Sequence, residues 1–278
     1  MESVTEKPFR FGVTATPDSP DQWLAVARRA EELGYSSLLM PDVTQMPSPM
    51  TALAVAAGAT TTLRLGTWVL AAPLRLARLA AWDGHTLSLL SGGRFEFGIG
   101  TGRPEVVAEA ARLLGEPELT AGQRLARMEQ TVDELRALDG ERHTPVLMAV
   151  GGPKARALAA AKADIVTLAM GLFASREEVA GLVAEVRAAA GERGNDLEFA
   201  MPIFVVGDEA PPWILRFMGA DMATLVARDS LMILRGGSPA ELADELQRRR
   251  DTLGISYFSV NGAFTEQFAP VMELLKGR

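Results

Sequence analysis

Residues 9–42 read FRFGVTATPDSPDQWLAVARRAEELGYSSLLMPD and contain a strand, a helix and a second strand. Phe9 to Thr16 is rich in β-branched and aromatic residues, which is typical of a strand. Ser19-Pro20-Asp21-Gln22 predicts a helix start, because serine can cap the helix, proline fits its first position and glutamine can bond back to the cap. The helix ends at Gly34, and Tyr35 to Asp42 is the next apolar strand. Such a unit is the repeat from which parallel sheets are built.

The same alternation continues to the end of the chain. Further strands are predicted at a spacing of roughly 30–35 residues, each followed by a helical pattern. They lie within Leu63–Pro73, Ser91–Gly102, Thr144–Gly152, Ala163–Met170, Leu197–Asp208 and Ile255–Asn261. Capping boxes at Ser175 and Ser238 mark two later helix starts.

Eight strand–helix repeats predict the α/β class and a (β/α)8 TIM barrel, with residues 1–278 as a single domain. A doubly wound open sheet is the competing topology, and the count of eight and the absence of a composition break favour the barrel. The widest gap between strands runs from Arg103 to Thr144, as a long helical stretch that ends near Leu138. We expect this gap to hold extra structure over the fourth strand.

Composition excludes several classes of protein. The chain has 278 residues, of which 48 % are hydrophobic, with a net charge of −7 and no cysteine. Absence of cysteine removes disulfides, thiolate metal sites and cysteine nucleophiles. The negative charge argues against nucleic acid as a partner, and no apolar run approaches the ~20 residues of a membrane helix. The N-terminal stretch resembles no signal peptide, so we expect a cytoplasmic protein that acts on a small molecule.

Catalytic groups of a barrel lie at the C-terminal ends of its strands, and few acids or bases stand there in this chain. His85 falls inside a helix and His143 precedes the fifth strand, so both are expected away from the mouth. Without histidine or cysteine at the mouth, neither a zinc site nor a Ser-His-Asp triad is supported, and we predict no metal. A barrel with so little chemistry of its own indicates a cofactor that supplies it.

Two glycine clusters fit a cofactor. Gly151-Gly152-Pro153-Lys154 ends a strand and opens a helix, so that free backbone N–H groups and a lysine lie at one point. This pattern favours a phosphate-binding site over a mere tight turn. Gly98-Ile99-Gly100-Thr101-Gly102 indicates either a ligand or close packing at a strand end. Small residues in Ala71-Ala72-Pro73 would let a planar ring approach the backbone. Asp42 is either a ligand-binding acid or a cap, and Arg103 either binds an anion or forms a structural ion pair.

The sequence resembles the bacterial luciferase-like flavin and deazaflavin oxidoreductases. The resemblance spans most of the chain in the right order and is most specific in SGGRFEFGIGTG, residues 91–102. It also rests on AEELGYSSLLMPD, LRLGTWVLAAPLR, VLMAVGGPKARALAAAKADIV and GGSPAELADELQRRRDTLGISYFSV. The likeness is closest to the branch that uses coenzyme F420.

The resemblance implies a barrel that holds F420, or alternatively FMN, at its mouth, and commonly a homodimer formed through barrel helices. The ring would pack on a bulge at the end of the third strand, with a non-prolyl cis peptide near Val69–Leu70 or Leu70–Ala71. Asp42, Trp68 and Arg103 are the candidates for shaping the reaction site. The implied cofactor-binding residues are Asp42, Val69, Leu70, Ala71, Gly100, Thr101, Gly102, Gly151, Gly152 and Lys154.

The chain also departs from the family pattern. Val43 stands where many F420 enzymes have a histidine, Arg103 where several have a glutamate, and Leu76-Ala77 where histidine-proline is usual. The fold and cofactor site therefore carry over better than any catalytic acid. Three functions stay open: an F420-dependent oxidoreductase acting on a small organic substrate, an FMN-dependent monooxygenase, and a flavin-binding barrel without turnover.

Overall fold

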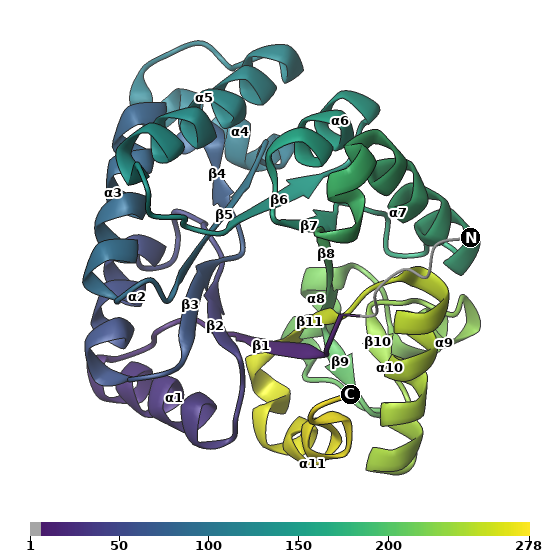
Figure 1. Cartoon of the computed structure of the whole chain (residues 1–278). Helices are drawn as coiled ribbons and strands as arrows, with labels where there is room; N and C mark the ends of the chain where they lie inside the picture. Colours follow the sequence, from purple (N-terminus) through teal and green to yellow (C-terminus); the bar gives the residue numbers. More distant parts are fainter. Residues whose placement is uncertain (1–6) are drawn as a thin grey trace.

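The computed structural model describes residues 7–278, in which parallel strands close into a barrel with helices around it (Figure 1). Strands β3 and β4 are two parts of the third barrel strand, so the nine segments of the sheet make an eight-stranded barrel closed by β3–β5 pairing. This confirms the predicted (β/α)8 fold. The segments are β1 (Arg10–Thr14), β2 (Ser37–Met40), β3 (Arg64–Thr67), β4 (Leu70–Ala71), β5 (Phe95–Gly100), β6 (Val146–Val150), β7 (Ile165–Leu168), β8 (Glu198–Ile203) and β11 (Tyr257–Asn261).

The helices follow the strands as the sequence indicates. They are α1 (Pro20–Glu32), α2 (Pro49–Ala59), α3 (Ala77–Leu90), α4 (Pro104–Leu114), α5 (Ala121–Asp139), α6 (Pro153–Lys162), α7 (Arg176–Ala190), α8 (Pro212–Met218), α9 (Met222–Ala227), α10 (Pro239–Leu253) and α11 (Thr265–Leu275). Short 3-10 helices occupy Ala72–Leu74 (η1), Gly191–Asn195 (η2) and Gly262–Phe264 (η3), and β9 (Val205–Val206) pairs with β10 (Ile233–Leu234) outside the barrel.

Helix starts follow their caps. Ser19, Ser175 and Ser238 each accept a hydrogen bond from a backbone N–H three residues later, and the last two form complete capping boxes. At the first helix, the side chain of Gln22 accepts from the N–H of Asp18 and not from Ser19, which corrects the expected bond back to the cap. No helix among residues 7–278 is long and apolar enough to cross a membrane.

The gap after β5 contains two helices instead of one long stretch. Gly115 ends α4 in the left-handed conformation, and α5 begins only after a new cap at Thr120. Helix α4 is additional to the barrel repeat and packs on η1, with Val107 and Ala110 near Pro73. The expected extra structure after the fourth barrel strand is therefore present, and it borders the mouth.

Side chains alternate along each strand between two packing environments. Outward residues such as Phe97 and Phe258 join the large core between strands and helices. Inward residues form a small separate apolar cluster of Leu39, Leu147, Ile165, Ala200 and Tyr257. This inner cluster fills the middle of the barrel and is the floor beneath the strand ends.

An ionic layer closes the barrel below that floor. Arg10 pairs with Glu96 and Glu198, and Arg64 pairs with Glu96 as well. Burial raises the pKa of Glu198, although the Arg10 guanidinium opposes the shift. Arg10 also lies over the ring of Tyr257, with 4.2 Å from its Cζ atom to the ring centroid. The floor of the site thus rests on charges that compensate each other.

Candidate functional site

A bulge in the third barrel strand shapes one side of the mouth. Four residue steps from Gly66 to Leu70 stand opposite three steps from Glu96 to Ile99, so one extra residue is accommodated between β3 and β4. The Trp68–Val69 peptide at this point is cis. The expected position, Val69–Leu70 or Leu70–Ala71, is wrong because Leu70 and Ala71 already pair regularly with β5.

Asp42 anchors the segment that follows the bulge. Its buried carboxylate accepts from the N–H of Ala71 at 2.9 Å and from both terminal nitrogens of Arg75. The end of β2 is thereby tied to β4 and η1. The structure therefore places the carboxylate of Asp42 under the bulge, with its oxygens engaged by the protein.

Trp68 and Val69 turn toward the inside of the barrel. Both pack on the inner cluster, and the Trp68 ring meets Tyr257 edge to face with 6.3 Å between ring centroids. Tyr257 in turn hydrogen-bonds the hydroxyl of Ser37. The bulge is thus supported from below by a fixed aromatic side chain.

Close packing accounts for part of the glycine run after β5. A Cβ atom on Gly98 would lie 1.8 Å from the carbonyl oxygen of Thr67, and one on Gly100 would lie 3.0 Å from Val69. Gly102 has a φ of 76° and faces Pro73. These glycines let β5 approach the bulge closely, so Gly100, Thr101 and Gly102 border the same corner of the mouth as Val69, Leu70 and Ala71.

The N-terminus of α6 differs because no side chain among residues 7–278 caps it, although Arg156 donates to the carbonyl oxygen of Gly151. Gly152 caps this helix without any side-chain hydrogen bond, and its φ of −73° is open to every residue type. A Cβ on Gly152 would meet no atom within 4 Å. Exposed Lys154 follows and has no ion pair among residues 7–278. Backbone N–H donors, a helix dipole and a free ammonium therefore face open space, which fits a phosphate group.

Arg103 stands across the mouth from β8. It begins α4, is exposed, and its guanidinium lies 5.8 Å from the ring of Phe217 in α8. No carboxylate pairs with Arg103 within the described part of the chain. Of its two sequence interpretations, a structural ion pair therefore finds no partner here.

Three groups at this site had not been anticipated. Arg75 completes the Asp42 anchor, Tyr257 supports Trp68, and Phe217 covers Arg103. Strand alternation in ISYFSVN, residues 255–261, could have indicated Tyr257 as an inward residue. Nothing local in the sequence marks the other two.

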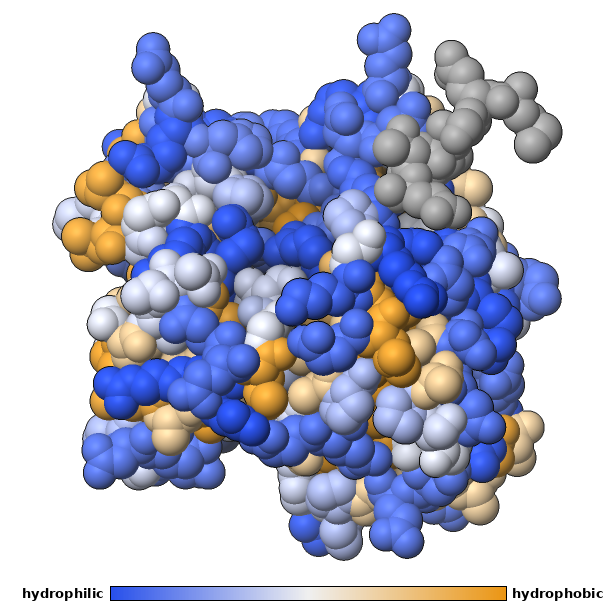
Figure 2. Space-filling view, turned by 60° about the horizontal axis from the view of Figure 1, so that its bottom comes forward, coloured by the Kyte–Doolittle hydropathy of each residue, from blue (hydrophilic) through white to orange (hydrophobic). Residues whose placement is uncertain are grey.

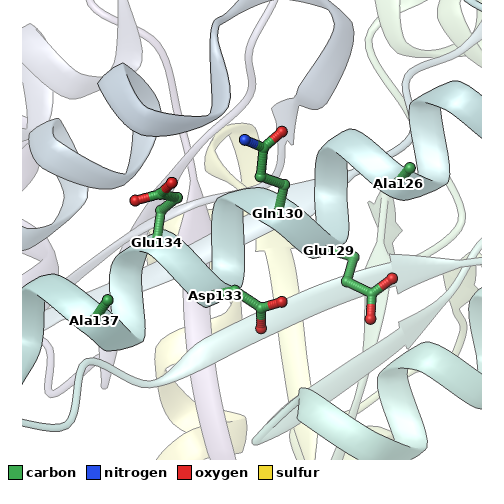
Figure 3. Close-up of a pocket in the computed structure, with 6 residues that line it drawn as sticks. All are labelled: Ala126, Glu129, Gln130, Asp133, Glu134 and Ala137. Atoms are coloured by element: carbon green, nitrogen blue, oxygen red, sulfur yellow. The ribbon is translucent and has the colours of Figure 1, made fainter.

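Both histidines pair with carboxylates away from the mouth, as expected. His85 hydrogen-bonds Asp139 at 2.8 Å and His143 hydrogen-bonds Asp164 at 2.9 Å. A hollow of about 450 Å³ on α5, shown in Figure 3, gathers Glu129, Asp133 and Glu134. Lys162 and Arg78 already form ion pairs with these carboxylates. No cluster of metal-ligating side chains occurs within residues 7–278.

Comparisons with known proteins agree with this fold. The chain resembles an F420-dependent secondary alcohol dehydrogenase, with 16 % identity, a TM-score of 0.77, and coverage of 97 % of this chain and 98 % of that one. It also resembles the F420-dependent tetrahydromethanopterin reductase of Methanopyrus kandleri, with 16 % identity, a TM-score of 0.72, and coverage of 96 % and 97 %.

A third similar structure is the EDTA monooxygenase of Chelativorans sp. BNC1, with 16 % identity, a TM-score of 0.74, and coverage of 97 % and 94 %. At these identities the structures support the fold alone. No curated protein sequence matches the chain. The sequence profile of the luciferase-like monooxygenases matches residues 1–216, and the chain therefore belongs to this family of oxidoreductases.

Proposed function

We propose that this protein is an F420-dependent oxidoreductase that transfers a hydride between the deazaflavin and a small organic substrate. The observation that carries the proposal is the N-terminus of α6 at Gly152, where a Cβ atom would meet no atom within 4 Å, with Lys154 beside it and without an ion pair among residues 7–278. F420 carries a long anionic tail, and a free cation at the rim favours such a ligand. The alcohol dehydrogenase of similar fold was solved with an F420–acetone adduct, which also supports this reading.

The chain's own residues would bind and orient the cofactor. Gly151, Gly152 and Lys154 hold its phosphate, while Val69, Leu70 and Ala71 support the ring and Gly100, Thr101 and Gly102 border it. When bound, F420 supplies the carbon that gives or accepts the hydride. Asp42 acts through Ala71 and Arg75 and is therefore a positioning residue, and Trp68 sets the depth of the ring.

An FMN-dependent monooxygenase is the main alternative, because the same phosphate site suits FMN. A barrel without turnover is the third, and the replacement of the family's histidine and glutamate by Val43 and Arg103 favours it. Cofactor preference separates the first two functions. Binding without any oxidation or reduction of the bound cofactor would identify the third.

A side-by-side calorimetric titration of the purified protein with F420 and FMN tests the proposal. We expect tight F420 binding and weak FMN binding. Gly152→Ala is expected to weaken F420 binding roughly tenfold or more, because the added methyl group occupies the phosphate position, and to leave the thermal midpoint unchanged. Lys154→Gln should weaken it as well, whereas Lys276→Gln, on the exposed C-terminal segment, is the matched control.

Each other result has a definite meaning. Preference for FMN replaces the proposal by the monooxygenase. Binding of neither cofactor by the folded protein would refute both enzyme assignments. Unchanged F420 affinity in Gly152→Ala would show that the phosphate does not bind at the N-terminus of α6.

We also propose a homodimer of single-domain subunits working in the cytoplasm. Helices α2 and α3 expose Val55, Leu79, Trp82 and Leu90 toward solvent. Figure 2 shows hydrophobic atoms along the left edge of the molecule, the side on which Figure 1 places these helices. The buried alanines of α2, Ala52 and Ala56, belong to the core of the subunit instead.

A further inference from the structure

We propose that Arg103 and helix α8 form the substrate-recognition wall of this enzyme, and that the substrate is a planar aromatic compound carrying an acidic group. This inference rests on the proposed function, because it names the substrate class of the same site. It is carried by an aromatic series that runs from the end of β8 to a guanidinium with no carboxylate partner among residues 7–278.

The series begins after the end of β8. Phe204 directly follows Ile203, the last residue of this strand, and packs against the large core. Its ring centroid is 5.5 Å from that of Phe217, in a tilted arrangement. An aromatic surface thus runs from the end of β8 to α8.

Helix α8 turns a second aromatic residue in the same direction. Trp213 and Phe217 are four residues apart, so they share one helix face, whereas Ile214 is buried in the core. Trp213 is 51 % exposed and Phe217 is 58 % exposed, although each has a large apolar area. Large aromatic side chains left uncovered at the mouth of an enzyme are suited to stack on a flat ligand.

Arg103 adds a charge to this wall. The ends of β5 and β8 are separated by β6 and β7, so the contact between Arg103 and Phe217 spans the ends of these two strands. The guanidinium of Arg103 has aromatic contact but no carboxylate within the described residues. Arginine binds carboxylates through two parallel hydrogen bonds while it stacks on an aromatic ring. A carboxylate attached to a flat ring satisfies both surfaces together.

The anion that reaches Arg103 could belong to the substrate or to the tail of the cofactor. The chemistry is the same in both cases, so the experiment must separate the sources. We expect the substrate to be the source, because the aromatic residues beside Arg103 add nothing to the binding of a flexible anionic tail.

Calorimetry with 2-naphthoate as the probe tests the proposal, on both the cofactor-free and the F420-saturated protein. We expect 2-naphthoate to bind at least about tenfold more tightly than cyclohexanecarboxylate, which is not flat, or 2-naphthylmethanol, which is not charged. Arg103→Gln should weaken 2-naphthoate binding roughly ten- to a hundredfold and leave 2-naphthylmethanol unaffected. Phe217→Leu should weaken both naphthalene ligands. Arg142→Gln, an exposed arginine at the opposite end of the barrel, is the matched control.

Two outcomes would overturn the inference. Equal affinity for all three probes would remove the aromatic-acid specificity. A loss of F420 affinity in Arg103→Gln with unchanged 2-naphthoate binding would assign Arg103 to the cofactor tail. Failure of the proposed function is distinguishable, because the wild-type protein would then bind 2-naphthoate without binding F420.

Discussion

At Asp42, one carboxylate accepts hydrogen bonds from Arg75 and from the backbone of Ala71, and so it ties two neighbouring strand ends together. Both oxygens are used inside the protein. The side chain therefore holds the shape of the segment that follows the bulge. In this barrel the acid at the end of β2 has a structural role.

Asp42→Asn should lower the free energy of unfolding by about 1–3 kcal/mol, because Arg75 loses its charged partner at a largely buried position. Urea unfolding measures this loss. The double variant with Arg75→Gln should lose less than the sum of the two single variants, because the residues share one interaction. Additive losses would contradict the anchoring role.

Gly98→Ala should prevent folding, because its new methyl group would lie 1.8 Å from the carbonyl oxygen of Thr67. Gly181→Ala is the matched control. Gly181 lies inside α7 with no atom within 4 Å of its Cβ position, so alanine there should raise stability by about 0.5–1 kcal/mol. Soluble expression and thermal midpoints of both variants decide the comparison.

The sequence predicts which single residues lie at the mouth, but not which residues they contact. Asp42 was identified as a mouth residue, yet neither of its alternatives included Arg75, because the contact depends on how two strand ends meet in space. Gly98 and Gly152 look alike in the sequence. Only the folded structure shows that close packing requires glycine at position 98 and not at position 152.

Among the elements, the end of α1 and the start of β3 are joined by Glu31. One carboxylate oxygen accepts from the N–H groups of Thr61, Thr62 and Leu63. Although partial burial opposes the shift, these hydrogen bonds lower the pKa of Glu31 to about 2. The ionised form therefore stabilises the turn that leads into the third strand.

Glu31→Gln should destabilise the protein at neutral pH, and the deficit should shrink with acid. The folded-state pKa lies below the ordinary value of 4.5, so the stabilisation is complete above pH 4.5 and is lost as the pH falls toward 2. Urea midpoints over a pH series measure the difference from the wild-type protein. Glu32→Gln is the control, and a constant deficit of Glu31→Gln at every pH would refute the assignment.

Element order followed from strand composition and helix caps, and it was confirmed throughout the barrel. Boundaries failed where tertiary contacts decide. Helix α3 begins only at Ala77, because Ala72–Leu74 form the 3-10 turn against which α4 packs. The cis peptide lies one step earlier than expected, because pairing with β5 fixes Leu70 and Ala71.

On the scale of the whole molecule, the barrel leaves one apolar side to the solvent. Leu76, Leu79, Leu89 and Leu90 join Trp82 along α3, and Trp82 is 59 % exposed. Exposed apolar side chains gathered on one face favour contact with another protein surface. A second copy presenting the same helices would bury them symmetrically.

Trp82→Arg combined with Leu90→Arg should convert a dimer to a monomer, because two charges would be forced into the apolar contact. Light scattering coupled to gel filtration should give twice the 29.7 kDa chain mass for the wild-type protein and the single mass for the variant. Leu274→Arg, on exposed α11, is the control and should stay dimeric. A wild-type monomer would refute the homodimer.

Closure of the barrel brings the two ends of the described chain into direct contact. The N–H of Phe9 donates to the carbonyl oxygen of Arg278 at 3.1 Å, just before β1 begins. The chain terminus therefore lies at the end of the barrel opposite the mouth. An enzyme immobilised through Arg278 on a bead or an electrode would present its reaction site to the solution, and a fusion partner attached there would not obstruct it.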